Sequence, residues 1–299
     1  MDVYLILLGL ILVLGRWMPQ TGPERKCYIA LMALLHLLLC GLRHPHLTGD
    51  LMKYHWDFLA AGSASWVPEG KNPGFFLLMK AVFHLTNGKI QIFLFLIATL
   101  IQLTAALVIY RCSPAPWLSY LTLNCLGFYL FGFSAIKQAL GMALVMAAFL
   151  GIMEDRPKFF LAMTLLAGAV HLPMLSFLPA YLLTRFRVNR GMLFAYALAA
   201  AALYLFRQPV AEFTKGLYYG AETTFSWSGG LGGRFFLILL IGTAGALLRG
   251  LEDPQFHKLI HLMAVSAILQ MFSGFDNVFT RLADVYFQFS VIFIPRMLC

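Results

Sequence analysis

Long, unbroken apolar stretches separated by short polar turns restrict the fold of this chain more than any other feature. A helix that crosses a membrane needs about 20 mostly apolar residues, and runs of that kind recur along the 299 residues. Only 12% of the residues are charged, against about 25% in an average soluble domain. Too few charges are therefore present to cover a soluble globule, and the same composition excludes an intrinsically disordered chain.

The runs predict an all-α, polytopic transmembrane protein with about nine to eleven membrane helices, including broken or re-entrant segments. A transmembrane β-barrel is excluded because its strands alternate apolar and polar residues. The expected spans cover residues 2–18, 26–42, 90–110, 117–134, 136–153, 191–206, 234–250, 257–273 and 279–298.

Two further apolar segments do not fit an ordinary span. Residues 72–87 are short and open with Asn-Pro-Gly. Residues 159–184 are too long for one helix and contain His171-Leu172-Pro173, where the proline removes a backbone donor and disfavours helix before it. Non-helical backbone at membrane depth is tolerated only where protein or a water cavity covers it. The break at His171 therefore indicates a cavity.

The basic residues suggest an orientation, because cytoplasmic turns carry an excess of Lys and Arg. The net charge is +9. With the N-terminus outside, the densest basic turns, 16–26, 154–158 and 185–190, all fall inside. We expect one integral membrane domain over residues 1–299, with outer loops at 43–72 and 207–233. Asp2 precedes the first apolar run, so we expect a retained helix rather than a cleavable signal peptide.

Charged and polar residues at the ends of spans, or inside them, are costly and therefore candidates for function. The expected topology places all of them toward the outer half of the membrane. They are Arg43, His44, Lys137, Gln138, His171, Arg281 and Asp284.

Each candidate also has a structural interpretation. Arg43 and Lys137 could extend to lipid headgroups, and Arg281 and Asp284 could form an ion pair along one helix face. His171 could be a buried histidine whose nitrogens are satisfied by the backbone that Pro173 frees.

Several classes of site have no support in the sequence. The chain has no Walker, GxGxxG, GxSxG or CxxC motif. His257 and His261 are four residues apart, but no glutamate follows to give a protease pattern, so we predict no metal. No cofactor and no nucleic-acid partner is expected, because the basic turns are short and bounded by apolar spans.

Several cations and one or two carboxylates beside aromatic residues suit a lipid diphosphate-sugar. Arginine binds phosphate in a bidentate manner, and fixed cations stabilise a leaving diphosphate. A carboxylate or a histidine could accept the proton of an acceptor hydroxyl. Tyrosine and tryptophan faces suit sugar rings.

Four patches, in order along the chain, resemble the EpsG family of exopolysaccharide polymerases, which are relatives of the Wzy polymerases. The first is Arg43-(x5)-Gly49-Asp50-(x3)-Tyr54, and the second is Lys137-Gln138-Ala139 at the start of a span. The third is His171 in a broken apolar segment. The fourth is Arg281…Tyr286-Phe287…Pro295 in the last span. The family usually has arginine at the position of Lys137. Lysine keeps the positive charge of arginine but lacks its planar, forked guanidinium.

The resemblance implies a GT-C-like membrane glycosyltransferase that joins polyprenyl-diphosphate-linked oligosaccharide repeat units. The active site would face the periplasm or the cell exterior at the bacterial inner membrane. It would work in the lipid bilayer alongside polysaccharide-assembly proteins such as a flippase and a chain-length regulator.

The resemblance also implies roles for single residues. Arg43, Lys137 and Arg281 would bind the diphosphate, and Asp50, or else His171, would be catalytic. The supporting residues would be His44, Tyr54, Gln138, Asp284 and Tyr286.

Two other classes of function stay open at this point. A membrane acyltransferase or an O-antigen ligase-type transferase also needs a histidine and cations at a membrane pocket, and His46 and Asp50 are four residues apart. A lipid-sugar transporter or flippase would use broken helices at its substrate site. Such a transporter should have charged residues in both halves of the membrane and internal symmetry, and neither is evident in this sequence.

Overall fold

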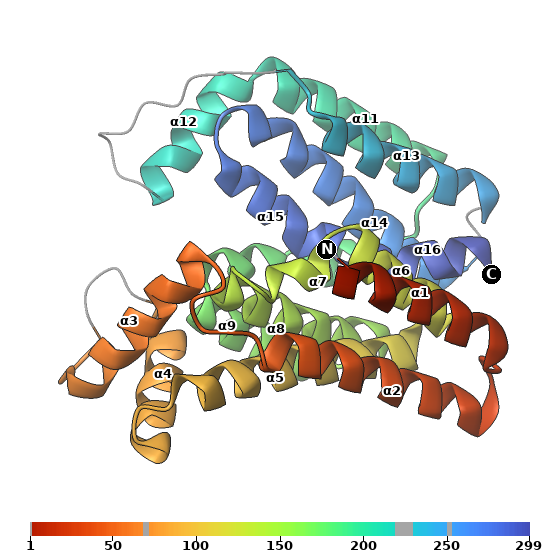
Figure 1. Cartoon of the computed structure of the whole chain (residues 1–299). Helices are drawn as coiled ribbons and strands as arrows, with labels where there is room; N and C mark the ends of the chain where they lie inside the picture. The colour runs from red at the N-terminus through yellow and green to blue at the C-terminus, as the bar shows by residue number, and fades with distance from the viewer. Residues whose placement is uncertain (1, 68–71, 219–229, 250–252) are drawn as a thin grey trace. The chain divides into compact units, whose positions relative to one another are not determined.

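The computed structural model describes residues 2–67, 72–218, 230–249 and 253–299, and every regular element in this part is a helix (Figure 1). The prediction of an all-α chain is therefore confirmed for the described residues. The chain divides into two compact units. Unit 1 contains residues 1–178 and 294–297 together with Cys299, and unit 2 contains residues 179–293 and Leu298. The prediction of one integral membrane domain is not tested by this division.

The described part of unit 1 contains nine α-helices and a 3-10 helix. Four of these α-helices have a proline in their first turn, where the missing N–H group would have had no partner within the helix. The helices of this unit are α1 (Asp2–Trp17), α2 (Gly22–Gly41), α3 (Gly49–Ser63), α4 (Pro73–Thr86), α5 (Ile90–Cys112), α6 (Pro116–Cys125), α7 (Phe128–Phe131), α8 (Ile136–Met153), α9 (Pro157–Val170) and η1 (Leu172–Phe177). Helix α8 packs along α9, and α5 contacts both α2 and α8.

A cluster of aromatic rings joins α3 and α4 to α5. Phe58 of α3 stacks on Phe93 of α5 with 5.1 Å between ring centroids, and Phe75 of α4 meets the same ring edge-on at 5.9 Å. All three side chains are buried. Aromatic pairs of this kind add to the free energy gained from burial, so the short helices α3 and α4 are fixed against the long helix α5.

The described part of unit 2 contains a second set of helices. They are α10 (Ala180–Leu183), α11 (Arg190–Leu205), α12 (Arg207–Tyr218), α13 (Gly233–Leu248), α14 (Pro254–Gln270), η2 (Met271–Gly274), α15 (Asn277–Phe287) and α16 (Ser290–Leu298), of which α16 crosses into unit 1. Helix α14 packs against both α13 and α15.

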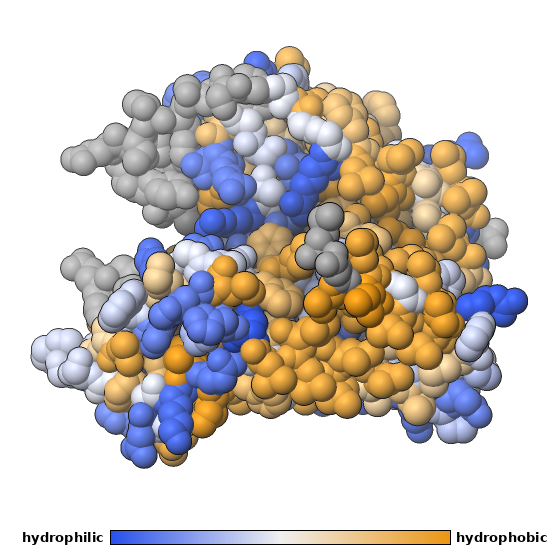
Figure 2. All heavy atoms as spheres, in the orientation of Figure 1, coloured by the Kyte–Doolittle hydropathy of each residue, from blue (hydrophilic) through white to orange (hydrophobic). Residues whose placement is uncertain are grey.

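Three described helices are long and apolar enough to cross a membrane: Ile90–Cys112, Ile136–Met153 and Pro254–Gly274. The number rises to five if two bent pairs, α11 with α12 and α15 with α16, each count as one span. The other predicted spans coincide with shorter or more polar helices, so a total of nine to eleven stays a prediction. Figure 2 shows hydrophobic side chains over α1 and α2, with hydrophilic ones gathered near the α1–α2 turn and around α3.

The predicted break at His171 is confirmed. Helix α9 ends at Val170, His171 has an extended backbone (φ −151°, ψ 106°), and η1 starts at Leu172. The freed amide of Leu172 donates to the side-chain oxygen of Asn72 at 3.0 Å. Because Asn72 is the N-cap residue of α4, the short apolar segment 72–87 supports the break in segment 159–184.

The two regions predicted as outer loops contain helices. Residues 43–72 include α3, because the side chain of Thr48 caps the helix by accepting a hydrogen bond from the Leu51 amide at 3.2 Å. Residues 207–233 begin with α12, and residues 219–229 of this region lie outside the described part of the chain. Parts of both regions are therefore helical, and their place on the outer side stays a prediction.

Gly74, in the first turn of α4, tests the packing that supports the break. A Cβ atom at this position would lie 2.9 Å from the backbone carbonyl of Ala169. Gly74→Ala should therefore separate α4 from α9 and destabilise the protein by about 1–3 kcal/mol, measured as a lower thermal midpoint in detergent. Gly9→Ala in α1 is the control, because nothing lies within 4 Å of its new Cβ. Equal midpoints for the two variants would contradict the close approach.

Candidate functional site

Arg43 lies just beyond the end of α2, and its guanidinium is buried, with the residue 5% exposed. Nη1 donates to the backbone oxygen of Cys40 and lies 3.0 Å from its Sγ, and the guanidinium lies 5.7 Å from the ring centroid of Phe133. Nε and Nη2 are buried without a hydrogen-bond partner among the described residues. A buried cation with unsatisfied donors is costly, so this position is suited to an anionic ligand.

No described carboxylate pairs with Arg43. Burial is the main influence on its ionisation and lowers the pKa of the guanidinium, while Cys40 and Tyr129 act in the opposite direction. Arginine nevertheless stays protonated in proteins. The side chain is therefore a fixed positive charge, and a diphosphate could accept hydrogen bonds from its remaining donors.

The backbone at Gly41 and Arg43 is fixed by a side chain of α5. Gln91 donates through Nε2 to the carbonyl oxygens of Gly41 at 2.7 Å and Arg43 at 3.3 Å. Gly41 itself allows close approach, because a Cβ atom there would lie 2.7 Å from the ring of Phe95. Arg43 is thus held by backbone and ring contacts rather than by a counter-ion.

Lys137 and Gln138 open α8 directly after the segment that contacts Arg43. Cys40 donates through Sγ to the carbonyl of Gly132 at 3.4 Å, and Phe133 lies against the Arg43 guanidinium. Gln138 is buried and its Nε2 lies 3.9 Å from the Sδ of Met142. The structure therefore brings Arg43 alongside the segment that leads into Lys137.

His171 packs against the face of α8 that Lys137 begins. A Cβ atom at Gly141 would lie 3.3 Å from the Cβ of His171, and Gly141 is four residues after Lys137, so both lie on one face of the helix. Arg43, Lys137 and His171 therefore share the neighbourhood of the start of α8. This is the candidate cationic site of unit 1.

Asp50 and Tyr54 lie one turn apart on α3, which follows Arg43 in the chain. Tyr54 packs edge-on against Phe75 at 5.7 Å between ring centroids. Asp50 is exposed in the first turn of α3 and makes no hydrogen bond or ion pair with the described residues. The structure thus anchors Tyr54 and leaves the Asp50 carboxylate accessible.

His44 belongs to a group of histidines rather than to a contact with Arg43. Its ring meets that of His46 edge-on at 5.4 Å, and Nε2 of His46 lies 2.9 Å from Nδ1 of His55. The pKa of His55 is lowered, first by partial burial and then by the neighbouring His46.

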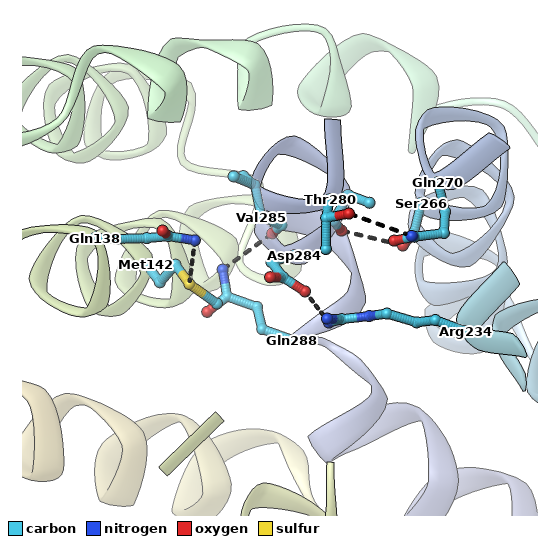
Figure 3. Close-up of polar contacts among 10 residues, drawn as sticks. Gln138, Met142, Arg234, Ser266, Gln270, Thr280, Asp284, Val285 and Gln288 are labelled. Carbon is cyan, nitrogen blue, oxygen red and sulfur yellow. Dashed lines mark hydrogen bonds and ion pairs between the residues drawn. The ribbon is translucent and has the colours of Figure 1, made fainter. Parts of the chain in front are cut away.

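In unit 2, Asp284 forms an ion pair with Arg234 of α13. Arg281, which could have paired with Asp284 along one helix face, is therefore not its closest partner. Figure 3 shows the Arg234 guanidinium directed at the Asp284 carboxylate. The Asp284 side chain is 1% exposed and that of Arg234 is 31% exposed. The Arg234 guanidinium also lies 5.5 Å from the centroid of the Phe287 ring.

Arg281 lies one helical turn before Asp284, is exposed, and makes no hydrogen bond or ion pair with the described residues. Tyr286 is buried. Helix α15 is held against α14 by two polar contacts, from Ser266 Oγ to the Ala283 carbonyl at 3.0 Å and from Gln270 Nε2 to Thr280 Oγ1 at 3.4 Å (Figure 3). Arg234 and Arg281 thus flank a buried carboxylate and form the cationic group of unit 2.

Arg234 was missed as a functional candidate, although the sequence contains a signal. It is the first residue of the predicted span 234–250, after two glycines, just as Lys137 lies at the start of its span. A charge in that position is a candidate by the same rule. Its partner Asp284 is 50 residues away in the sequence, so the pairing itself could not be predicted.

His257 and His261 contact neighbouring elements of unit 2. His257 Nδ1 accepts a hydrogen bond from the Val188 amide at 3.1 Å. His261 contacts the Tyr196 hydroxyl at 2.6 Å through Nδ1 and the Phe186 carbonyl at 2.9 Å through Nε2. These contacts fix the turn before α11 against α14. Among the described residues, no group of three or more His, Cys, Asp or Glu side chains is arranged to bind a metal.

The apolar helices and the two cationic groups indicate a helical membrane protein with positions suited to an anionic ligand. The chain belongs to the EpsG family, whose model matches residues 26–299. The match covers nearly the whole chain, and EpsG is a family of exopolysaccharide polymerases. Members are polymerase-type glycosyltransferases, which implies a lipid-linked oligosaccharide substrate in the membrane. No curated protein and no solved structure matches the chain significantly.

The ion pair in unit 2 gives a direct test of the site geometry. Arg234→Met should destabilise the protein by about 3 kcal/mol, because it leaves a buried carboxylate without its partner. Arg281→Met should change stability by less than about 0.5 kcal/mol, as expected of an exposed side chain. The measurement is the thermal midpoint in detergent, followed by two double-mutant cycles in which Arg234→Met and Arg281→Met are each combined with Asp284→Asn. A larger coupling of Asp284 to Arg281 than to Arg234 would contradict this arrangement.

Proposed function

We propose that this protein joins polyprenyl-diphosphate-linked oligosaccharide repeat units at the outer face of the bacterial inner membrane. The observation that carries the proposal is the buried Arg43 guanidinium, which has two unsatisfied donors. A diphosphate supplies the charge and the hydrogen-bond acceptors that such a group needs. Membership in the EpsG family supports the choice of a lipid-linked glycosyl donor.

The proposed reaction is a glycosyl transfer. A sugar hydroxyl of the acceptor attacks the anomeric carbon of the donor, a new C–O bond forms, and the bond from that carbon to the diphosphate oxygen breaks. Polyprenyl diphosphate leaves with the bonding electrons, and a base takes the hydroxyl proton. The protein must therefore stabilise the leaving diphosphate and accept one proton.

Arg43 and Lys137 in unit 1, and separately Arg281 in unit 2, are proposed to bind diphosphate. Asp50 is the proposed base because its exposed carboxylate has no ion-pair or hydrogen-bond partner among the described residues. His171 is the alternative base, since it lies against the α8 face that begins with Lys137. Tyr54, with His44, would contact sugar rings, while Gln138, Asp284 and Tyr286 support the cations.

The proposal extends to the architecture and location of the protein. It includes a GT-C-like fold with nine to eleven membrane helices and an active site that faces the periplasm or the cell exterior. It also includes cooperation with a flippase, which supplies repeat units, and with a chain-length regulator.

Arg43→Ala should reduce polymerisation by about 10²- to 10³-fold, the usual effect of removing one donor to a developing anion. Arg43→Lys should recover only part of the activity, because it keeps the charge and loses the planar fork. The measurement is the length distribution of surface polysaccharide in cells that carry each variant at equal protein level. Arg16→Ala, an exposed arginine in the last turn of α1, is the matched control. Long polymer at the normal rate in the Arg43→Ala cells would contradict the role of Arg43.

A further inference from the structure

Unit 2 contains an apolar groove of about 390 Å³ between α11, α13 and α14. Its volume falls in the range of about 300–1,000 Å³ that is typical of ligand pockets. Small residues make up part of the groove lining, among them Ala197, Ala200, Gly242, Ala246, Ala264 and Ala267. Thr243 and Tyr196 are the polar residues of its lining.

The groove is long in the direction of the helices. On α13 its lining extends from Phe235 to Leu247, which corresponds to about 18 Å at 1.5 Å per residue. Half of a hydrocarbon core is about 15 Å. The groove therefore fits an extended hydrocarbon chain that follows a membrane leaflet, rather than a compact ligand.

One end of the groove leads to the cationic group of unit 2. Ile238 lines the groove, and Arg234 lies four residues before it on the same face of α13. Arg234 is fixed by Asp284, and Arg281 lies one turn from Asp284 on α15. Only one of the five N–H donors of Arg234 is used by Asp284, so the others are available to a phosphate.

We infer that this groove binds the polyprenyl chain of a lipid-linked substrate, with its diphosphate at Arg234 and Arg281. The inference rests on the proposed function and deepens it by assigning the lipid part of the substrate to named residues. Two arginines complement two phosphates, and one apolar groove of about 390 Å³ suits one chain. A phospholipid, with two acyl chains and a single phosphate, matches both features less well.

The test uses the full-length protein in nanodiscs and a polyprenyl diphosphate probe that carries a photoreactive diazirine and no sugar. Crosslinked peptides, identified by mass spectrometry, should come from α11, α13 and α14. Unlabelled polyprenyl diphosphate should compete at least 10-fold better than phosphatidylglycerol. Crosslinks confined to other helices, or equal competition by phosphatidylglycerol, would overturn the inference.

Substitutions in α13 provide matched variants. A Cβ atom at Gly242 would lie at an ordinary 3.6 Å from Met263 Cβ, so Gly242→Ala should bind the probe normally, whereas Gly242→Leu should fill the groove and reduce labelling about 10-fold. Leu240 is outside the groove lining and 64% exposed, so Leu240→Phe should have no effect. Equal labelling of all three variants would contradict the inference. If Gly242→Leu does not fold, the crosslinks of the unmodified protein still show whether the probe binds in the groove.

The failure of this inference can be distinguished from the failure of the proposed function. If the unmodified protein labels in the groove but does not polymerise any lipid-linked repeat unit, the polymerase proposal is wrong and the lipid site stands. If it polymerises but labels elsewhere, the groove is not the lipid site. For an active protein, Gly242→Leu should raise KM about 10-fold for an undecaprenyl substrate and leave KM unchanged for a geranyl analogue.

Discussion

The cost of burying polar and charged groups in apolar surroundings is the constraint on which this structure depends. Backbone groups at membrane depth need partners, and buried charges need counter-ions or ligands. The break after α9 meets the first requirement, because Asn72 accepts the hydrogen bond of the Leu172 amide. Asp284 meets the second through Arg234. Arg43 does not, since two of its donors are buried without partners in the described part of the chain.

The two arginines are therefore positioned in different ways. Arg234 stabilises a buried carboxylate and is itself partly exposed, so it can keep a defined geometry and still contact a ligand. Arg43 is positioned by Gln91 and by the close contact of Gly41 with Phe95, without any carboxylate. The proposed diphosphate would bind at such a site with little rearrangement, which is the condition for electrostatic stabilisation of a leaving group.

Each unit carries its own cationic group, and the proposed reaction uses two lipid-linked reactants. A polymerase must hold the diphosphate of the growing chain and that of the incoming repeat unit. Each group has two cations, enough for one such anion. They are Arg43 and Lys137 in unit 1, and Arg234 and Arg281 in unit 2. The groove beside Arg234 adds a position for one polyprenyl chain.

Much of the helical arrangement could be predicted because apolar length is a strong signal. The span predicted at 136–153 corresponds to α8 residue for residue, and the break at His171 followed from Pro173. The helix α3 within the expected loop 43–72 was not predicted, since its cap at Thr48 is a weak signal beside the polar residues around it. The pairing of Arg234 with Asp284 depends on tertiary packing over 50 residues, which periodicity does not encode.

The proposed function requires that this protein itself catalyses glycosyl transfer between lipid-linked oligosaccharides. The most direct measurement uses the purified protein in vesicles with a lipid-linked repeat unit as the only substrate, and follows both chain length and free polyprenyl diphosphate. One polyprenyl diphosphate should appear for each repeat unit that is added to the growing chain. Unchanged substrate, or hydrolysis to free oligosaccharide without any longer product, would contradict it.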